Sequence, residues 1–208
     1  MSTTSNRVLS IYKSRKTILE ILEYQNYVIE EYSAFTINEI DAMYKNKQLD
    51  MLLTHESNNT KIYVKYCLDT KQLKQQLDNF IEDLYTIENI LTKKDTLIII
   101  MDDDINDTTQ TRLKYLFDHD GIFIVLHNIK RLQFNILNHT LVPACTVLNE
   151  EELKELKEKY SIKQLSQLPE ISRFDPQALA MCLRPGQVCK FERDSMTALK
   201  YNYYRVCV

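Results

Sequence analysis

The sequence predicts an α/β protein made of two domains, a mixed-sheet domain over residues 1–138 and a smaller α+β domain over residues 139–208. Apolar runs at residues 97–101 and 122–126 flank a helical pattern, which is typical of a strand-helix-strand unit. All four prolines and one of the two glycines lie after residue 140. Turn-forming residues are therefore concentrated in the second domain, which indicates a different architecture there.

The first 46 residues predict two helices. Apolar residues from 6 to about 24 recur at intervals of three and four, which is the spacing of an amphipathic helix. A short extended segment, residues 27–29, follows it. Thr36 and Glu39 then form a Thr-x-x-Glu capping box, in which hydroxyl and carboxylate each satisfy a free backbone amide. A second helix is therefore expected to run to about Asn46.

The next segment predicts a hairpin and then a long helix. Residues 51–53 and 62–67 are largely apolar and flank small polar residues at 57–60, as in an antiparallel strand pair joined by a turn. From residue 73 to residue 91, apolar side chains recur at three and four. This spacing predicts a helix over that whole range.

Two continuous apolar runs, residues 97–101 and 122–126, predict central strands. Neither run alternates with polar residues, as expected for strands covered on both faces. A helix is expected between them, from Thr109 to Phe117. Such a connection normally requires parallel strands and a right-handed crossover. The first domain is therefore expected to pack helices on a mixed sheet.

Capping signals place two helices in the second domain. Asn149 and Glu152 form another capping box, which opens a helix over residues 150–160. Asp175 precedes Pro176, so a capping carboxylate stands before a proline at the first helical position. Proline is favoured there because the backbone amide that it lacks would have no partner inside the helix.

Two strands are expected to complete the second domain. Pro185 and Gly186 should stop the helix that Asp175 begins. Residues 187–193 and 201–208 then form strands joined through residues 194–197. The expected fold is a compact sheet with two short helices.

Composition excludes several classes of function. Phosphate loops, dinucleotide fingerprints and hydrolase elbows need closely spaced glycines, and the chain has two in 208 residues. Five widely spaced cysteines without a Cys-x-x-Cys pair argue against a disulfide framework or a structural zinc site, and indicate small buried side chains. The formal net charge of −3 lacks the basic excess of a protein that binds nucleic acid alone. No signal peptide, membrane contact, cofactor, metal or small-molecule substrate is expected.

Asp102, Asp103 and Asp104 carry the one alternative with a catalytic role. They follow an apolar strand, at the edge where ligands of open α/β sheets gather, and clustered carboxylates can hold Mg²⁺. No lysine stands two residues after a carboxylate on an adjoining strand, as a nuclease-like metal site would need. A solvated loop is the preferred interpretation of the three aspartates, and a Mg²⁺-dependent nuclease is the alternative.

A series of short sequence motifs in the last third of the chain carries a family resemblance. In order, they are Leu141-Val142-Pro143, Gln167-Leu168-Pro169, Asp175-Pro176 and Pro185-Gly186-Gln187-Val188. The series resembles the assembly domain of the fifth-largest subunit shared by the eukaryotic nuclear RNA polymerases, which has an archaeal counterpart. The resemblance covers about the last 68 residues, and the order of elements before them is compatible with the family's jaw domain, which is similar in fold to some endonucleases.

The resemblance implies a set of contacts with other polymerase components. The second domain would dock on the largest subunit through Arg173, Pro176, Lys190, Arg193, Ser195, Tyr201 and Arg205. In the jaw domain, Thr108, Thr109 and Gln110 correspond to a family segment that faces downstream duplex DNA. This chain lacks the proline and serine of that segment, and it has Ala144-Cys145 where relatives usually carry Lys-His.

The resemblance also implies the kind of function. The chain would be a non-catalytic structural subunit of a DNA-directed RNA polymerase that helps form the downstream DNA cleft, with catalysis in the two largest subunits. It would act in the nucleus if cellular, or in host cytoplasm and virion if encoded by a large DNA virus. A free-standing adaptor that uses residues 139–208 to bind other proteins is a further alternative.

Overall fold

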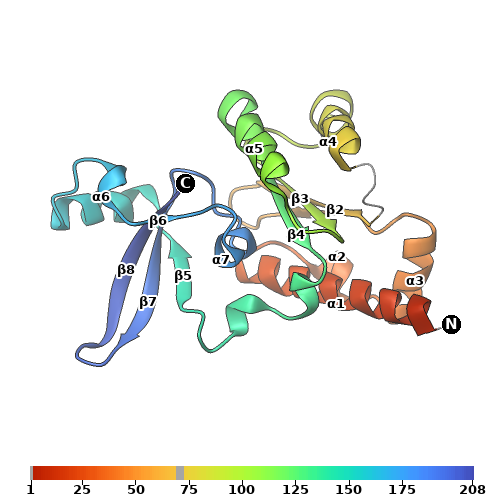
Figure 1. The fold of residues 1–208 in the computed structure, drawn as a ribbon, viewed down its shortest axis with the longest axis horizontal. Coiled ribbons are helices and arrows are strands. Elements are labelled where there is room, and N and C mark those ends of the chain that lie inside the picture. Colours follow the sequence, from red (N-terminus) through yellow and green to blue (C-terminus); the bar gives the residue numbers. More distant parts are fainter. Residues whose placement is uncertain (1, 69–72) are drawn as a thin grey trace. The chain divides into compact units, whose positions relative to one another are not determined.

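The computed structural model describes residues 2–68 and 73–208, and the chain divides into two compact units, residues 1–135 and 136–208. Each unit has its own four-stranded sheet (Figure 1). The division falls a few residues before the boundary expected from proline and glycine usage.

The first unit contains a mixed sheet in the order β1-β2-β3-β4. Its strands are β1 (Met51–Thr54), β2 (Lys61–Cys67), β3 (Thr96–Met101) and β4 (Phe123–Asn128). The β1–β2 pair is antiparallel, whereas β2–β3 and β3–β4 are parallel. Every residue of β3 and β4 is buried. The predicted hairpin, the parallel pair and the covered central strands are thus confirmed.

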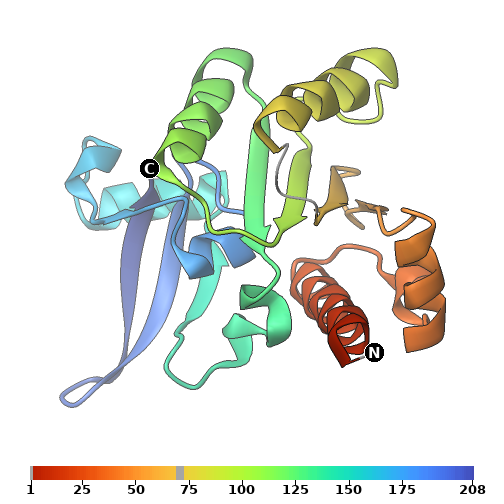
Figure 2. The same cartoon turned by 45° about the vertical axis from the view of Figure 1, so that its right-hand side comes forward.

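Helices cover both faces of this sheet. The helices of this unit are α1 (Ser2–Tyr24), α2 (Glu30–Ser33), α3 (Ile37–Lys45), α4 (Leu73–Ile81) and α5 (Asp107–Tyr115). Figures 1 and 2 show α4 and α5 side by side on one face and α1 on the other. Because α4 joins β2 to β3 and α5 joins β3 to β4, both parallel connections cross the same face.

Three expectations for this unit need correction. The helix predicted over residues 73–91 ends as an α-helix at Ile81 and continues as a π-helical segment only to Ile87. The helix expected from Thr109 begins at Asp107, because Asn106 caps it by accepting from Thr109 N (2.9 Å). After Tyr27, which bridges to His55, the chain forms the unpredicted helix α2.

The capping box before α3 is confirmed. Glu39 N donates to Thr36 Oγ1 (3.4 Å), and Thr36 N donates to Glu39 Oε2 (2.7 Å). These two bonds satisfy amides that have no partner inside the helix. They also lower the pKa of Glu39, because hydrogen bonds from the Thr36 amide and hydroxyl favour the ionised carboxylate.

Thr36→Ala is expected to lower the free energy of unfolding by about 1 kcal/mol at neutral pH, because it removes the hydroxyl that accepts from Glu39 N and donates to Glu39 Oε2. Urea titration followed by circular dichroism measures the change. The stabilisation that depends on the Glu39 carboxylate is fully present above its unfolded-state pKa of about 4.3. It is lost as the pH falls through the lower pKa that Glu39 has in the folded state. Asn38→Ala, on the exposed part of α3, is the matched control and should have little effect. Equal stability of the two variants would contradict the role of the capping box.

The second unit has a sheet in the order β5-β7-β8-β6. Its strands are β5 (Ala144–Val147), β6 (Glu170–Ile171), β7 (Val188–Ser195) and β8 (Leu199–Cys207). The long β7–β8 hairpin confirms the two predicted strands. The edge strands β5 and β6 were not predicted; β5 pairs antiparallel with β7, and β6 pairs parallel with β8.

Both predicted helices of this unit are present, as α6 (Glu150–Lys159) and α7 (Pro176–Ala180). The Asn149 capping box and the Asp175 cap are confirmed. The end of α7 was predicted too late, at Pro185 and Gly186. The helix ends at Ala180 because Cys182 adopts a left-handed conformation (φ 50°), and Leu183 N then donates to Ala178 O (3.0 Å).

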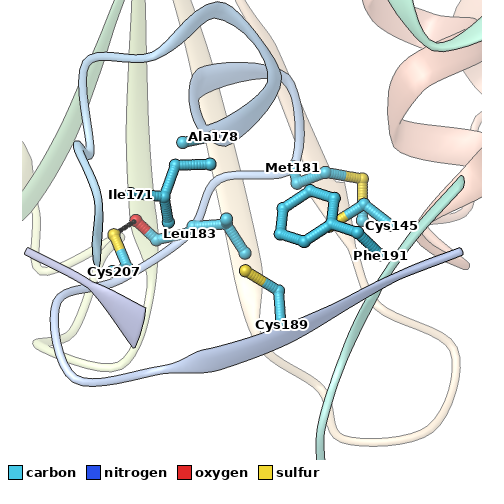
Figure 3. Packing of buried hydrophobic residues seen from close by; sticks show 8 residues of the cluster. All are labelled: Cys145, Ile171, Ala178, Met181, Leu183, Cys189, Phe191 and Cys207. Carbon is cyan, nitrogen blue, oxygen red and sulfur yellow. Dashed lines mark hydrogen bonds between the residues drawn. The ribbon is translucent and has the colours of Figure 1, made fainter. Parts of the chain in front are cut away.

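Apolar clusters lie on both faces of this sheet. The cluster beside α7 contains the residues drawn in Figure 3, namely Cys145, Ile171, Ala178, Met181, Leu183, Cys189, Phe191 and Cys207. The opposite face packs Val188 and Val206 against Leu156 of α6. All five cysteines have free thiols, and four of them are buried, while Cys182 is half-buried. Burial raises the pKa of the Cys207 thiol to about 11, so this group stays protonated at neutral pH.

Candidate partner-binding surface

The β7–β8 hairpin extends beyond the part that α7 covers. Directly opposed residues of an antiparallel pair share a face, so the register places Arg193 beside Tyr201 and Phe191 beside Tyr203 on one face. Towards α7 this face carries the buried Cys189 and Phe191. Farther along the hairpin, the same face carries polar and aromatic side chains that remain accessible.

We call Arg193, Tyr201, Tyr203 and Arg205 the Arg-Tyr stripe. The guanidinium carbon of Arg193 lies 4.4 Å from the Tyr203 ring centroid, and that of Arg205 lies 5.5 Å from the same centroid. Such cation–π contacts hold both arginines against one ring. Tyr203 also packs against the apolar cluster beside α7, so the stripe is fixed to the rigid part of the unit.

The structure brings together only part of the predicted contact set. Arg193, Tyr201 and Arg205 lie in the stripe, and Ser195 follows on the same face. Ser195 Oγ accepts from the amides of Thr197 and Ala198 (3.3 Å each), so it also shapes the hairpin turn.

The other predicted contacts lie elsewhere in the second unit. Lys190 projects from the opposite face of β7, in register with Tyr204. Arg173 follows β6, and its amide donates to Val208 O (2.9 Å). Pro176 is exposed at the first position of α7. Tyr203 was not among the individually predicted contacts, although its two-residue spacing from Tyr201 and Arg205 signals a shared face.

The predicted DNA-proximal residues lie in the first turn of α5. Thr108 and Thr109 both donate hydroxyl hydrogens to Asn106 Oδ1, at 2.9 and 2.6 Å. Gln110 is the next residue and is half-buried. The two hydroxyls therefore already serve the helix cap.

The negative charges of the three aspartates after β3 are partly balanced by neighbouring side chains. Arg7 donates to both carboxylate oxygens of Asp102, and this interaction raises the pKa of Arg7. Asp104 accepts from Asn128 Nδ2 (3.0 Å) and lies 3.5 Å from Arg131 Nη2. Among residues 2–68 and 73–208, no group of three or more histidine, cysteine, aspartate or glutamate residues is placed to hold a metal ion. In the same described part of the chain, no helix is long and apolar enough to cross a membrane.

Known proteins resemble this chain over one or both units. Residues 134–207 match the model of the family described as RNA polymerase Rpb5, C-terminal domain. An archaeal DNA-directed RNA polymerase subunit Rpo5, from Thermococcus kodakarensis, is 47% identical over 76 residues, which are 36% of this chain and 92% of that protein. The Dictyostelium discoideum subunit rpabc1 of DNA-directed RNA polymerases I, II and III is 30% identical over 204 residues, which are 98% of each chain.

These matches confirm the resemblance expected from the proline- and glycine-containing motifs. The archaeal relative corresponds to about the length of the second unit, whereas the Dictyostelium relative extends over both units. The chain therefore belongs to the Rpb5 family of DNA-directed RNA polymerase subunits.

Proposed function

We propose that this polymerase subunit is non-catalytic and that its second unit anchors it to the largest subunit of the enzyme. The Arg-Tyr stripe carries the proposal. Arginine and tyrosine are enriched at the energetic centres of protein interfaces, where they fill pockets on the partner. Here two arginines and two tyrosines share one face of the β7–β8 hairpin, partly beside and partly beyond an apolar core.

Pre-ordering of the stripe supports this role. Long side chains lose rotamer freedom when they enter an interface, and this loss weakens binding. Because Arg193 and Arg205 already lie against Tyr203, part of that ordering precedes binding. The contribution of Lys190, on the opposite face, would require a partner that also reaches around the hairpin.

The first unit would help form the wall of the downstream DNA cleft. The exposed or half-buried residues 108–110 at the N-terminal end of α5 are the proposed DNA-proximal positions. Backbone amides at a helix N-terminus favour a nearby phosphate. Since 16 basic and 20 acidic residues precede position 141, we expect DNA contact only where partners hold the duplex.

The aspartate arrangement favours this proposal over the nuclease alternative. Arg7 occupies both oxygens of Asp102, and Asp104 has Asn128 and Arg131 beside it. A Mg²⁺ ion would have to displace these partners to gain its oxygen ligands. Phosphodiester chemistry would then belong to other subunits, in the nucleus for a cellular enzyme or in host cytoplasm and virion for a viral one.

Affinity purification of the tagged chain from its native source tests the anchoring role. We expect the wild-type chain to recover the largest polymerase subunit, and Arg193→Ala to recover it about tenfold less, as expected for loss of about 1.4 kcal/mol of binding. Lys154→Ala, an exposed charge on α6, is the matched control and should behave as wild type. Lys190→Ala reports separately on the opposite face.

Two outcomes would count against the proposal. Recovery of no large polymerase subunit with the wild-type chain would remove the anchoring role. Unchanged recovery with Arg193→Ala, when circular dichroism shows that both variants are folded, would move the contact away from the stripe. Mg²⁺-dependent DNA cleavage that disappears in Asp102→Asn would instead support the nuclease.

A further inference from the structure

A cavity of about 200 Å³ lies within the first unit, between α1, α2 and α3. Aromatic side chains of Tyr12, Tyr32 and Phe35 contribute much of its wall, together with aliphatic side chains from the same elements. Arg15 also lines it, from the middle of α1. The cavity is thus a mainly apolar space with an arginine in its wall.

Arg15 is one of the largest fully buried side chains of the described residues, with 2% of its surface exposed. Its Nη1 donates to Leu49 O (2.8 Å). Its Nε and Nη2 are buried and have no hydrogen-bond partner in the part of the chain that the structure describes. Two donors on one edge of the guanidinium are therefore unsatisfied, which is costly for a buried cation.

The aromatic rings near Arg15 compensate this charge only in part. The guanidinium carbon lies 5.8 Å from the Tyr32 ring centroid and 5.4 Å from the Phe35 centroid. Burial lowers the pKa of Arg15, yet an arginine side chain remains protonated in proteins. Lys16 and Glu20 also line the cavity, and their formal charges cancel, so the site keeps the positive sign of Arg15.

The geometry of the unsatisfied donors indicates which ligand they suit. Nε–H and an Nη–H of arginine point in parallel and can donate side by side to the two oxygens of a carboxylate. A cavity of about 150 Å³ lined by apolar residues can bind benzene. A space of about 200 Å³ therefore holds a group of benzoate size and is too small to enclose a nucleotide.

We propose that this cavity binds a carboxylate carried on a small apolar group, with the carboxylate on Arg15 and the apolar part against the aromatic wall. The group could belong to a free organic acid or to the C-terminal residue of a peptide. Because Arg15 Nε and Nη2 are buried, the carboxylate reaches them only when a ring beside the guanidinium rotates. Leu52 N donates to Tyr32 Oη (3.3 Å) and so restrains that ring, which leaves half-buried Phe35 as the ring that moves.

Titration of the isotope-labelled full chain with benzoate, followed by amide chemical shifts, tests the site. We expect saturable shifts confined to residues around α1, α2 and α3, and at least tenfold weaker binding of benzyl alcohol, which has the same ring without the charge. N-acetylphenylalanine and its amide form a second pair. Tighter binding of that acid than of benzoate would indicate a peptide C-terminus, and the reverse order a free acid.

Arg15→Met keeps an extended apolar side chain and removes the cation, so it is expected to fold and to lose at least tenfold in benzoate affinity. Lys13→Met, an exposed lysine of α1 that does not line the cavity, is the matched control and should bind as wild type. Equal affinity for benzoate and benzyl alcohol, absence of saturable shifts in the wild type, or unchanged benzoate binding by Arg15→Met would each overturn the proposal.

Discussion

Phe191→Ala is expected to lower the free energy of unfolding of residues 136–208 by about 3–5 kcal/mol. Phe191 is 2% exposed and fills the space between Met181, Cys145 and Cys189 beside α7 (Figure 3). Its removal loses the transfer free energy of the ring and leaves a cavity that the short strands cannot close. Since so small a unit is only marginally stable, this loss is a large fraction of its free energy of unfolding.

Heat or urea unfolding followed by amide chemical shifts in each unit measures this effect. Signals from residues 136–208 should shift to unfolded positions at much lower denaturant than in the wild type. Met196→Ala at the hairpin tip, where the side chain is 105% exposed, is the control and should change stability by less than about 0.5 kcal/mol. Similar midpoints for the two variants would mean that Phe191 does not organise this core.

Asp95→Ala is expected to destabilise the first unit by about 3–5 kcal/mol. The Asp95 side chain is 5% exposed and accepts from Lys61 N (2.6 Å), Thr92 N (2.7 Å) and Thr92 Oγ1 (2.7 Å). These contacts tie the start of β2 to the turn that precedes β3. Alanine removes the carboxylate that these three donors share, and a hydrogen bond to a charged group contributes about 1.5–3 kcal/mol.

Urea unfolding of the first unit, followed by amide chemical shifts, checks this value. Asp103→Ala, which removes an exposed carboxylate after β3, is the matched control and should be nearly neutral. The loss of stability in Asp95→Asn should lie between those of the other two variants. The asparagine amide keeps one acceptor oxygen, but its NH₂ group then faces a backbone or hydroxyl donor. If Asp95→Ala is no less stable than Asp103→Ala, the hydrogen bonds of Asp95 carry little net energy.

Elements defined by local chemistry were predicted well. The capping boxes at Thr36 and Asn149 depend on two side chains three residues apart, so sequence alone specifies them. The strands β3 and β4 are continuous apolar runs whose length excludes a buried helix.

Elements defined by their partners could not be predicted in the same way. The strand β5 alternates exposed residues with the buried Cys145, and β6 has two residues, so neither carries a usable pattern. Both exist because the β7–β8 hairpin offers them backbone hydrogen bonds. Likewise, α7 ends early because Cys182 adopts a left-handed conformation that residue identity does not favour.

The candidate site follows partly from residue parity. Arg193, Tyr201 and Arg205 occupy alternating positions of their strands, so the sequence could predict that they share one face of the hairpin. By the same alternation, Lys190 is predicted on the other face. Arg15 also had a signal, because it interrupts the apolar stripe that contains Ile11, Ile18 and Leu22. The cavity beside it depends on how α2 and α3 pack, which no local pattern specifies.

The strand order of the second sheet has a consequence for biosynthesis. Because β8 lies between β7 and β6 yet is the last of the four to be translated, a nascent chain that stops before residue 199 lacks the strand joining them. This module therefore acquires its fold only once β8 has left the ribosome. A premature stop codon within that strand would expose apolar surface to chaperones and proteases, and would not yield a shortened working subunit.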